Sequence, residues 1–216
     1  TGFLGLLLKN VEKINIFLST TTLCVSPAMQ DELQKISKKS NITSIIPGSC
    51  AGLSHKKYSS TKDIESKCKS KQNRSELRVL FIGRGQERKG IYSLIDAAKN
   101  KRILESEIII NMVGFDISDL KSEYRKNLPK NIVFHGFQKN VNSFYINNDI
   151  IILPSWHEGF GYTLLEGAAY GCAMIGSKIP GPDCLIIDNY NGALVQPRSP
   201  KEIENSILEY YNDSVK

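Results

Sequence analysis

The chain has 216 residues, of which 41% are hydrophobic and 23% are charged, a composition typical of globular proteins that excludes disordered and fibrous classes. The length exceeds the roughly 100 to 200 residues of one domain and predicts one full domain plus part of another. The net charge of +6 comes from residues 29–78, which hold 11 Lys/Arg against 5 Asp/Glu. This segment lacks the interleaved aromatics of a nucleic-acid surface, so we expect no nucleic-acid partner.

The location of the protein is suggested by its cysteines and its apolar runs. The five cysteines are scattered without a Cys-x-x-Cys pair, which favours a reducing cytoplasm. The first apolar stretch, 2–8, is far too short for a membrane span, and no signal peptide is recognisable. The basic segment favours a solvated linker, or more weakly attraction to the inner membrane surface. We therefore expect a cytoplasmic protein with possible peripheral membrane contact.

The first part of the chain reads as pieces of an α/β domain. Its pattern predicts a strand at 21–27, a helix at 27–36 and a second strand at 41–47. The polar, lysine-rich stretch that follows is typical of a connection between domains. We therefore assign 1–47 to the tail of an incomplete N-terminal domain and 48–76 to an interdomain linker.

From residue 77 onward, short runs rich in Ile and Val alternate with stretches of helical period, which predicts successive βα units. The predicted strands are 78–83, 107–113, 132–135, 150–153, 173–177 and 193–195. The predicted helices are 91–100, 118–126, 141–146, 163–170, 182–187 and 200–211. Residues 77–216 should thus form a doubly wound, Rossmann-like α/β domain with a parallel sheet. Ligands of such sheets bind at the carboxyl ends of the strands, in the loops after Gly83, His135 and Leu153.

The first candidate loop runs from Gly83 to Gly90 with the sequence GRGQERKG. Its glycines permit close backbone approach, the following helix presents unpaired amides, and Arg84 and Lys89 can close on a diphosphate from two sides. The loop matches neither a Walker motif nor Gly-x-Gly-x-x-Gly. Because glycine-rich charged turns are also common without function, this loop alone only suggests a phosphate site.

The second candidate loop, 154–171 (PSWHEGFGYTLLEGAAYG), is more specific. It places Glu158 just after a strand and Glu166 in the first turn of the next helix, so that both carboxylates should converge on one crevice. Glu166 is placed to accept the hydroxyls of a ribose. Gly159 and Gly161 leave backbone amides bare beside the helix start.

Structural roles for the same residues remain open at this point. Thr163 and Glu166 also fit a capping box, which would stabilise the helix by about 1 kcal/mol. The side chains of Phe160 and Trp156 suit packing or loop shielding as well as ligand contact. Asp116 and Asp119 have the spacing of a helix cap.

Taken together, GRGQERKG, PSWHEGFGYTLLEGAAYGCAMIGS and NGALVQP make the chain resemble the family-4 retaining glycosyltransferases of the GT-B fold, the group 1 glycosyl transferases. The resemblance spans nearly the whole chain. It implies a C-terminal donor-binding domain, a truncated N-terminal domain, a domain-joining segment at 45–58 and a missing C-terminal helix.

The resemblance also implies roles for the residues of both loops. Arg84 and Lys89 would neutralise the leaving diphosphate, Glu158 would contact the transferred sugar, and Glu166 would hold the ribose. Whether Glu158 is a nucleophile or an electrostatic stabiliser stays open. The other positions expected to border the sugar, the phosphates or the base are Gly83, Gln138, Gly159, Phe160, Gly161, Thr163 and Leu164.

By the same resemblance the parent protein would be a retaining hexosyltransferase of the EC 2.4 class in polysaccharide or lipopolysaccharide synthesis. Its donor would be a nucleotide-diphosphate sugar and its acceptor a glycan or a lipid-linked glycan. The chain has no Asp-x-Asp motif, and such enzymes need no bridging metal, so we expect no cofactor and no metal ligand. The alternatives are a nucleotide-sugar-binding fragment without turnover and a nucleotide-sugar epimerase, and the isolated fragment is expected to be inactive.

Overall fold

The computed structural model describes residues 3–37, 42–44, 65, 67 and 74–214, and the chain divides into two compact units, Thr1–Gly52 and Leu53–Lys216. Most of the predicted linker and all of the predicted domain-joining segment lie outside the described residues. The domain boundaries predicted from the sequence therefore stay a prediction.

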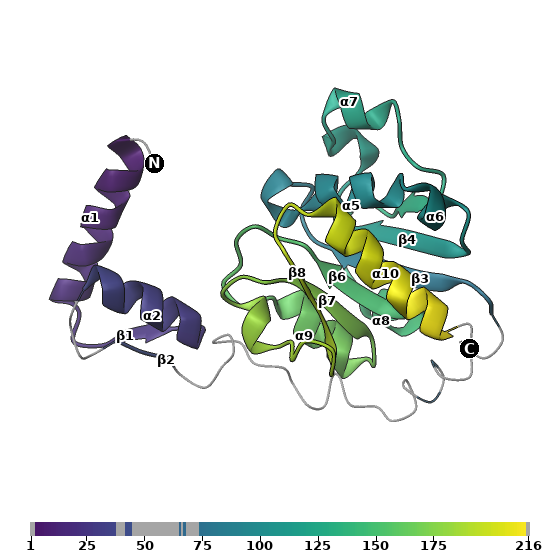
Figure 1. Ribbon diagram of the computed structural model, residues 1–216. Coiled ribbons are helices and arrows are strands. Elements are labelled where there is room, and N and C mark those ends of the chain that lie inside the picture. Colours follow the sequence, from purple (N-terminus) through teal and green to yellow (C-terminus); the bar gives the residue numbers. More distant parts are fainter. Residues whose placement is uncertain (1–2, 38–41, 45–64, 66, 68–73, 215–216) are drawn as a thin grey trace. The chain divides into compact units, whose positions relative to one another are not determined.

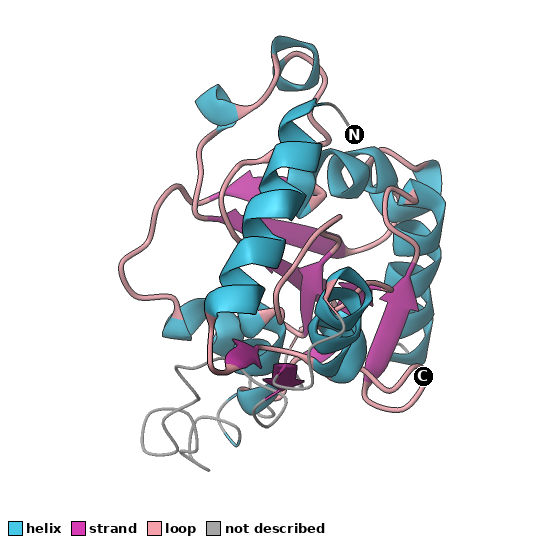
Figure 2. Cartoon of the chain, turned by 90° about the vertical axis from the view of Figure 1, so that its left-hand side faces the viewer, coloured by secondary structure: helices cyan, strands magenta, loops and turns pink. Residues whose placement is uncertain are grey.

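The described part of the first unit contains two helices and two short parallel strands. α1 (Phe3–Leu18) is the continuous helix that starts beside the N-terminus label in Figure 2. It precedes β1 (Thr22–Cys24), α2 (Pro27–Ile36) and β2 (Ile42–Ser44), of which β1 and β2 pair in parallel. The three later elements were predicted from the sequence, whereas α1 was not. In the described residues no helix combines the length and the apolar character that crossing a bilayer requires.

The second unit is built on a parallel six-stranded sheet with the order β5-β4-β3-β6-β7-β8 (Figure 1). Its strands are β3 (Leu77–Ile82), β4 (Ile108–Val113), β5 (Ile132–Phe134), β6 (Ile150–Leu153), β7 (Ala173–Ser177) and β8 (Gly192–Val195). The six strands predicted from the sequence are confirmed, and their ends agree to within one residue. The agreement is good because these strands are short, mainly apolar runs, and the central ones are buried on both faces, as all four residues of β6 are.

The helices agree less closely with the prediction. They are α5 (Ile91–Ala98), α6 (Lys101–Leu104), α7 (Ser122–Arg125), α8 (Asn142–Asn147), α9 (Tyr162–Ala169) and α10 (Pro200–Ser214), with 3-10 turns η1 (Glu87–Lys89), η2 (Ile117–Asp119) and η3 (Pro182–Cys184). The single helix predicted at 118–126 is wrong, because η2 and α7 are separate turns. The helix predicted at 182–187 is only η3. α6 was missed, and it starts where the Asn100 side chain accepts a hydrogen bond from the amide of Arg102 at 2.9 Å.

Helices cover both faces of the sheet (Figure 1). Alternate residues of β3 point to opposite sides: Val79 and Phe81 lie in an apolar cluster with α5 and α10, and Leu80 lies in a second cluster with α8 and α9. The doubly wound, Rossmann-like α/β fold predicted from the sequence is therefore confirmed.

Candidate functional site

The strand order favours a ligand site between β3 and β6. The chain runs outward from β3 through β4 to β5, and outward in the other direction from β6 through β7 to β8. The connections after the two central strands therefore leave on opposite faces, which opens a crevice at the carboxyl ends of β3 and β6. Both loops singled out in the sequence follow these two strands.

The loop after β3 is locked against the loop after β6. Gly90 has a φ of +75° and lies between η1 and α5. A Cβ at Gly90 would lie 1.9 Å from the carbonyl oxygen of Pro154, so only glycine permits this approach. The amide of Trp156 also donates to the carbonyl oxygen of Arg88 at 2.8 Å. These contacts hold the basic loop beside the loop that carries Glu158.

A cavity of about 250 Å³ lies at the carboxyl ends of the two central strands. The residues that line it are Ile82, Gly83, Arg84, Lys89, Leu153, Glu158, Tyr162 and Thr163. Five of these are site residues predicted from the sequence, namely Gly83, Arg84, Lys89, Glu158 and Thr163. Tyr162 was not predicted, since nothing in the run GYTLLEG distinguishes it from a packing residue.

The cavity contains an ion pair between the two loops. Lys89 Nζ pairs with Glu158 Oε1, and the hydroxyl of the buried Ser155 donates to the same oxygen at 2.9 Å. Only 18% of the Lys89 side chain and 12% of the Glu158 side chain are exposed, whereas Arg84 is exposed at the rim. The cavity thus offers a ligand two cations and one carboxylate that is already oriented by a hydroxyl.

α9 begins beside this cavity. Gly161, with a φ of +91°, is its N-cap residue, and the first amides of a helix lack intrahelical acceptors and carry partial positive charge. Thr163 lies inside the first turn, so the capping box that the sequence left open as an alternative does not form. The Oγ1 atom of Thr163 is buried and makes no hydrogen bond with any residue that the structure describes. The helix start therefore adds donors to the cavity.

Glu166 lies one turn beyond Tyr162 and is not among the residues that line the cavity. Its Oε2 atom accepts a hydrogen bond of 2.7 Å from the hydroxyl of Tyr145 in α8. Sequence reasoning missed Tyr145, because an aromatic residue in a predicted helix gives no sign of where its hydroxyl points. Glu158 therefore lies in the loop after β6 and Glu166 in the helix that follows it, and the two carboxylates have different partners.

The remaining predicted residues do not line the cavity. Phe160 is 5% exposed and packs edge-on against Tyr162, which favours its structural role. The side chain of Leu164 is fully buried, and its amide donates to the carbonyl oxygen of Gly161 at 2.9 Å. Gln138 is exposed after β5 and donates to the carbonyl oxygen of His135 at 2.6 Å.

Gly159 packs against the turn after β7. A Cβ at Gly181 would lie 3.1 Å from the carbonyl carbon of Gly159, so these two backbones are in close contact. Trp156 contacts a further loop, since the guanidinium carbon of Arg198 lies 3.8 Å from its ring centroid. The loop after β6 is thus supported by three neighbouring loops.

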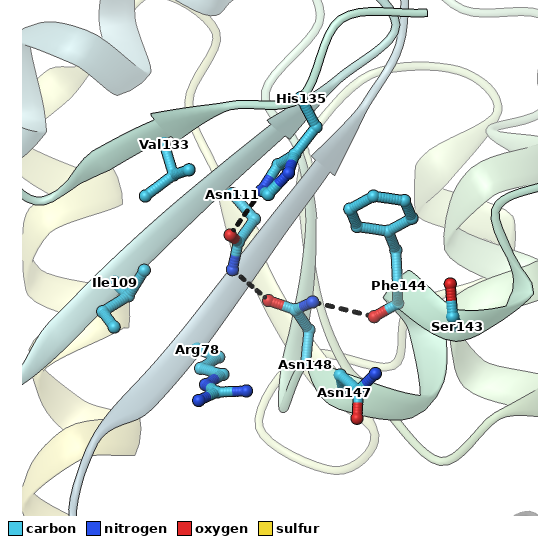
Figure 3. Close-up of a pocket in the computed structure, with 9 residues that line it drawn as sticks. All are labelled: Arg78, Ile109, Asn111, Val133, His135, Ser143, Phe144, Asn147 and Asn148. Atoms are coloured by element: carbon cyan, nitrogen blue, oxygen red, sulfur yellow. Dashed lines mark hydrogen bonds between the residues drawn. The ribbon is translucent and has the colours of Figure 1, made fainter. Parts of the chain in front are cut away.

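A larger cavity, of about 500 Å³, lies on the α8 face of the sheet rather than at its carboxyl edge (Figure 3). A chain of hydrogen bonds crosses it: Asn148 donates to the carbonyl oxygen of Phe144, Asn111 donates to Asn148, and Asn111 Oδ1 contacts His135 Nε2, each at 2.8 Å. None of the predicted site residues lines this cavity.

This chain of hydrogen bonds fixes the tautomer of His135. A carbonyl oxygen can only accept, so each amide in turn donates toward Phe144, and His135 Nε2 must carry the proton that Asn111 Oδ1 accepts. Burial lowers the pKa of His135, because the charged imidazole is less well solvated there.

The described residues contain no group of three His, Cys, Asp or Glu side chains that could hold a metal ion. Asp116 and Asp119 lie at η2, where the amide of Asp116 donates to Asp119 Oδ2 at 2.9 Å. The interpretation of this pair as a helix cap therefore agrees with the structure.

Comparison with protein families decides the affiliation of the chain. The family model described as "Glycosyl transferases group 1" matches residues 63–216. The chain belongs to the group 1 glycosyl transferases. The resemblance seen in the sequence is thus confirmed for this family, and both candidate loops lie within the matched residues. The finer assignment to family 4 stays a prediction.

Relatives of this group 1 glycosyl transferase include two named bacterial enzymes. The chain is 25% identical over 219 residues to the capsular polysaccharide biosynthesis glycosyltransferase CapM of Staphylococcus aureus, covering 98% of this chain and 57% of CapM. It is 27% identical over 148 residues to the UDP-Gal:alpha-D-GlcNAc-diphosphoundecaprenol alpha-1,3-galactosyltransferase of Escherichia coli, covering 66% of this chain and 38% of that enzyme.

Solved structures share the fold of this group 1 glycosyl transferase. The crystal structure of Anabaena HepE in complex with UDP and glucose matches it with a TM-score of 0.76 at 20% identity, covering 95% of this chain and 58% of HepE. The chain therefore spans between 38% and 58% of the length of these three relatives.

Proposed function

We propose that the chain carries the donor-binding half of a retaining glycosyltransferase that moves a sugar from a nucleoside-diphosphate sugar to a glycan or lipid-linked acceptor, in polysaccharide or lipopolysaccharide synthesis. The observation that carries the proposal is the cavity between β3 and β6, which gathers Arg84, Lys89 and Glu158 beside the start of α9. The printed names of CapM and of the galactosyltransferase, and the UDP and glucose bound to HepE, support the same class of reaction.

The diphosphate would bind between Arg84 and Lys89, with the first amides of α9 as further donors. Lys89 would exchange Glu158 for a phosphate oxygen. When the bond between the sugar and the diphosphate breaks, negative charge grows on the leaving oxygen, so both cations would act mainly in the transition state.

The transferred sugar would lie beside Glu158, whose carboxylate is oriented by Ser155. As the sugar becomes oxocarbenium-like it gains positive charge, which a fixed carboxylate stabilises. Glu166 would accept hydrogen bonds from the ribose, and the backbone at 136–138 would border the base. Retention of configuration is part of the proposal.

Calorimetric titration of the chain with UDP, GDP and ADP sugars tests the proposal. We expect one nucleotide to bind, and Lys89→Ala and Glu166→Ala to weaken it at least tenfold, since each loses a contact with a charged group worth about 1.5–3 kcal/mol. Lys99→Ala is the matched control, because Lys99 pairs with Asp96 at 2.9 Å and does not line the cavity. Unchanged affinity in both site variants would contradict the assignment of the site.

The other readings give different results in the same assay. A binding fragment without turnover would take up the donor and transfer nothing to any acceptor. An epimerase would convert the sugar without an acceptor and release free nucleotide. A cytoplasmic location stays a prediction that rests on the scattered cysteines, and contact with anionic lipid stays a prediction that rests on the basic segment 29–78.

A further inference from the structure

A buried hydroxyl donates a hydrogen bond to the carboxylate that is proposed to hold the ribose. Tyr145 is fully buried in α8, and its hydroxyl donates to Glu166 Oε2 at 2.7 Å. Hydrogen bonds to an ionised carboxylate are about twice as strong as those between neutral groups. The contact joins α8 to α9, which are successive helices on the same face of the sheet.

The ring and the backbone of Tyr145 are both held by neighbouring residues. The ring of Tyr145 stacks on Tyr170, with centroids 5.5 Å apart and planes 7° from parallel. The ammonium of Lys67, a residue that is only 5% exposed, donates to the backbone carbonyl oxygens of Tyr145 at 3.0 Å and Tyr170 at 3.1 Å. Because a tyrosine side chain has only two torsions, these contacts fix its hydroxyl in space.

Glu166, in contrast, has a long side chain, whose carboxylate needs a fixed orientation to accept the hydroxyls of a ribose. It follows Thr163 by one turn of α9, and Thr163 lines the cavity that holds Arg84 and Lys89. Loss of the hydrogen bond from Tyr145 would leave the Glu166 carboxylate less firmly oriented, and it would then accept the ribose hydroxyls less well. An ionised carboxylate can accept about four hydrogen bonds, so one from Tyr145 is compatible with two from a ribose.

We propose that Tyr145 is a positioning residue, which holds the Glu166 carboxylate in the orientation that selects a ribose in the donor. This inference rests on the proposed function. Tyr145 does not touch the donor, and it acts only through Glu166. Its loss should therefore weaken recognition of the ribose hydroxyls and leave recognition of the diphosphate intact.

The test compares a ribonucleotide with its 2′,3′-dideoxy counterpart. Calorimetry first identifies which of UDP, GDP and ADP binds the chain, and Tyr145→Phe is then titrated with both forms of that nucleotide. We expect affinity for the ribonucleotide to fall about tenfold, and affinity for the dideoxy form to change less than twofold. Tyr124→Phe is the matched control, since it removes a phenol that donates to the Asp96 carboxylate at 2.9 Å on the opposite face of the sheet.

A second variant keeps the test independent of how well Tyr145→Phe folds. Glu166→Asp retains the charge but withdraws the carboxylate from the phenol, so it should also lose selectivity for the ribose. In the double variant the two losses should not add, because both break the same contact. Melting curves of each variant record any general loss of structure.

The outcomes separate the two proposals. If Glu166→Ala weakens binding but Tyr145→Phe affects both nucleotides equally or not at all, the positioning role is overturned and the proposed function stands. If no nucleoside diphosphate binds the parent chain, the proposed function fails and the positioning role fails with it.

Discussion

His135 is a titratable side chain held at the start of the turn that the proposed base would border. Its ring contacts Asn111 through Nε2 and lies edge-on to Phe144, with centroids 4.9 Å apart. Because burial lowers its pKa, the folded state binds a proton less readily than the unfolded state, whose histidine has a pKa near 6.5. This contribution to stability is present above pH 6.5 and is lost as the pH falls through the pKa of the folded state.

We therefore expect the free energy of unfolding of the His135→Gln variant to fall less than that of the parent when the pH is lowered from 7 to 5. Urea unfolding at several pH values measures how the free energy of unfolding of each protein depends on pH. The free energies at pH 8 provide the baseline, since His135 is neutral there in both states. Parallel curves for the two proteins would contradict the prediction. A substitution of Asn111 would complement this test, because Asn111 accepts the hydrogen bond of the His135 ring.

The turn between β3 and α5 shows how one element constrains another. Gly90 combines a positive φ with an approach to Pro154 that leaves no room for a Cβ. We expect Gly90→Ala to displace the loop after β3 from the loop after β6, to cost at least about 3 kcal/mol of unfolding free energy, and to weaken nucleotide binding. Urea unfolding and calorimetry measure the two effects.

Gly171 offers a matched control for this prediction. Its φ of +72° is almost the same, but a Cβ there would have no atom within 4 Å. Gly171→Ala should therefore show only the cost of the left-handed backbone, about 1–2 kcal/mol. Equal losses in the two variants would mean that the contact with Pro154 is unimportant.

The position of α9 also depends on Gly167, which has no side chain. A Cβ at Gly167 would lie 2.5 Å from Cγ2 of Ile151, so glycine allows α9 to lie close against β6. This close packing determines the distance of α9, and so of Glu166, from the sheet. Gly90 and Gly167 thus allow two elements to pack closely, which is a different role from ending a helix.

For the molecule as a whole, the two compact units have separate cores. Ile16, Cys24 and Ile42 form the core of the first, and the two clusters on the faces of the sheet belong to the second. All residues that line the two cavities lie between Arg78 and Thr163. We expect residues 53–216 alone to unfold cooperatively and to bind the nucleotide within about threefold of the parent affinity. Circular dichroism and calorimetry check this, and loss of binding in a folded fragment would contradict it.

The sequence predicts much of this architecture because the relevant signals are local. The strand 150–153 is a continuous apolar run, and the two loops carry their glycines and charges within a few residues. The pairing of Tyr145 with Glu166 could not be predicted, since it depends on how α8 and α9 lie against each other. The capping interpretation of Thr163 failed for a similar reason: the N-cap residue is Gly161, two residues earlier than the Thr-x-x-Glu spacing suggests.

The placement of β6 directly beside β3 has a consequence for folding. Along the chain, β3, β4 and β5 all precede β6, the strand that pairs with β3 at the centre of the sheet. The cavity between β3 and β6 therefore forms only when the two halves of the sheet pair. A molecule held there would bridge both halves, and neither could open without releasing it. Occupancy would then raise the free energy of unfolding of the domain in proportion to the logarithm of ligand concentration once the site is saturated.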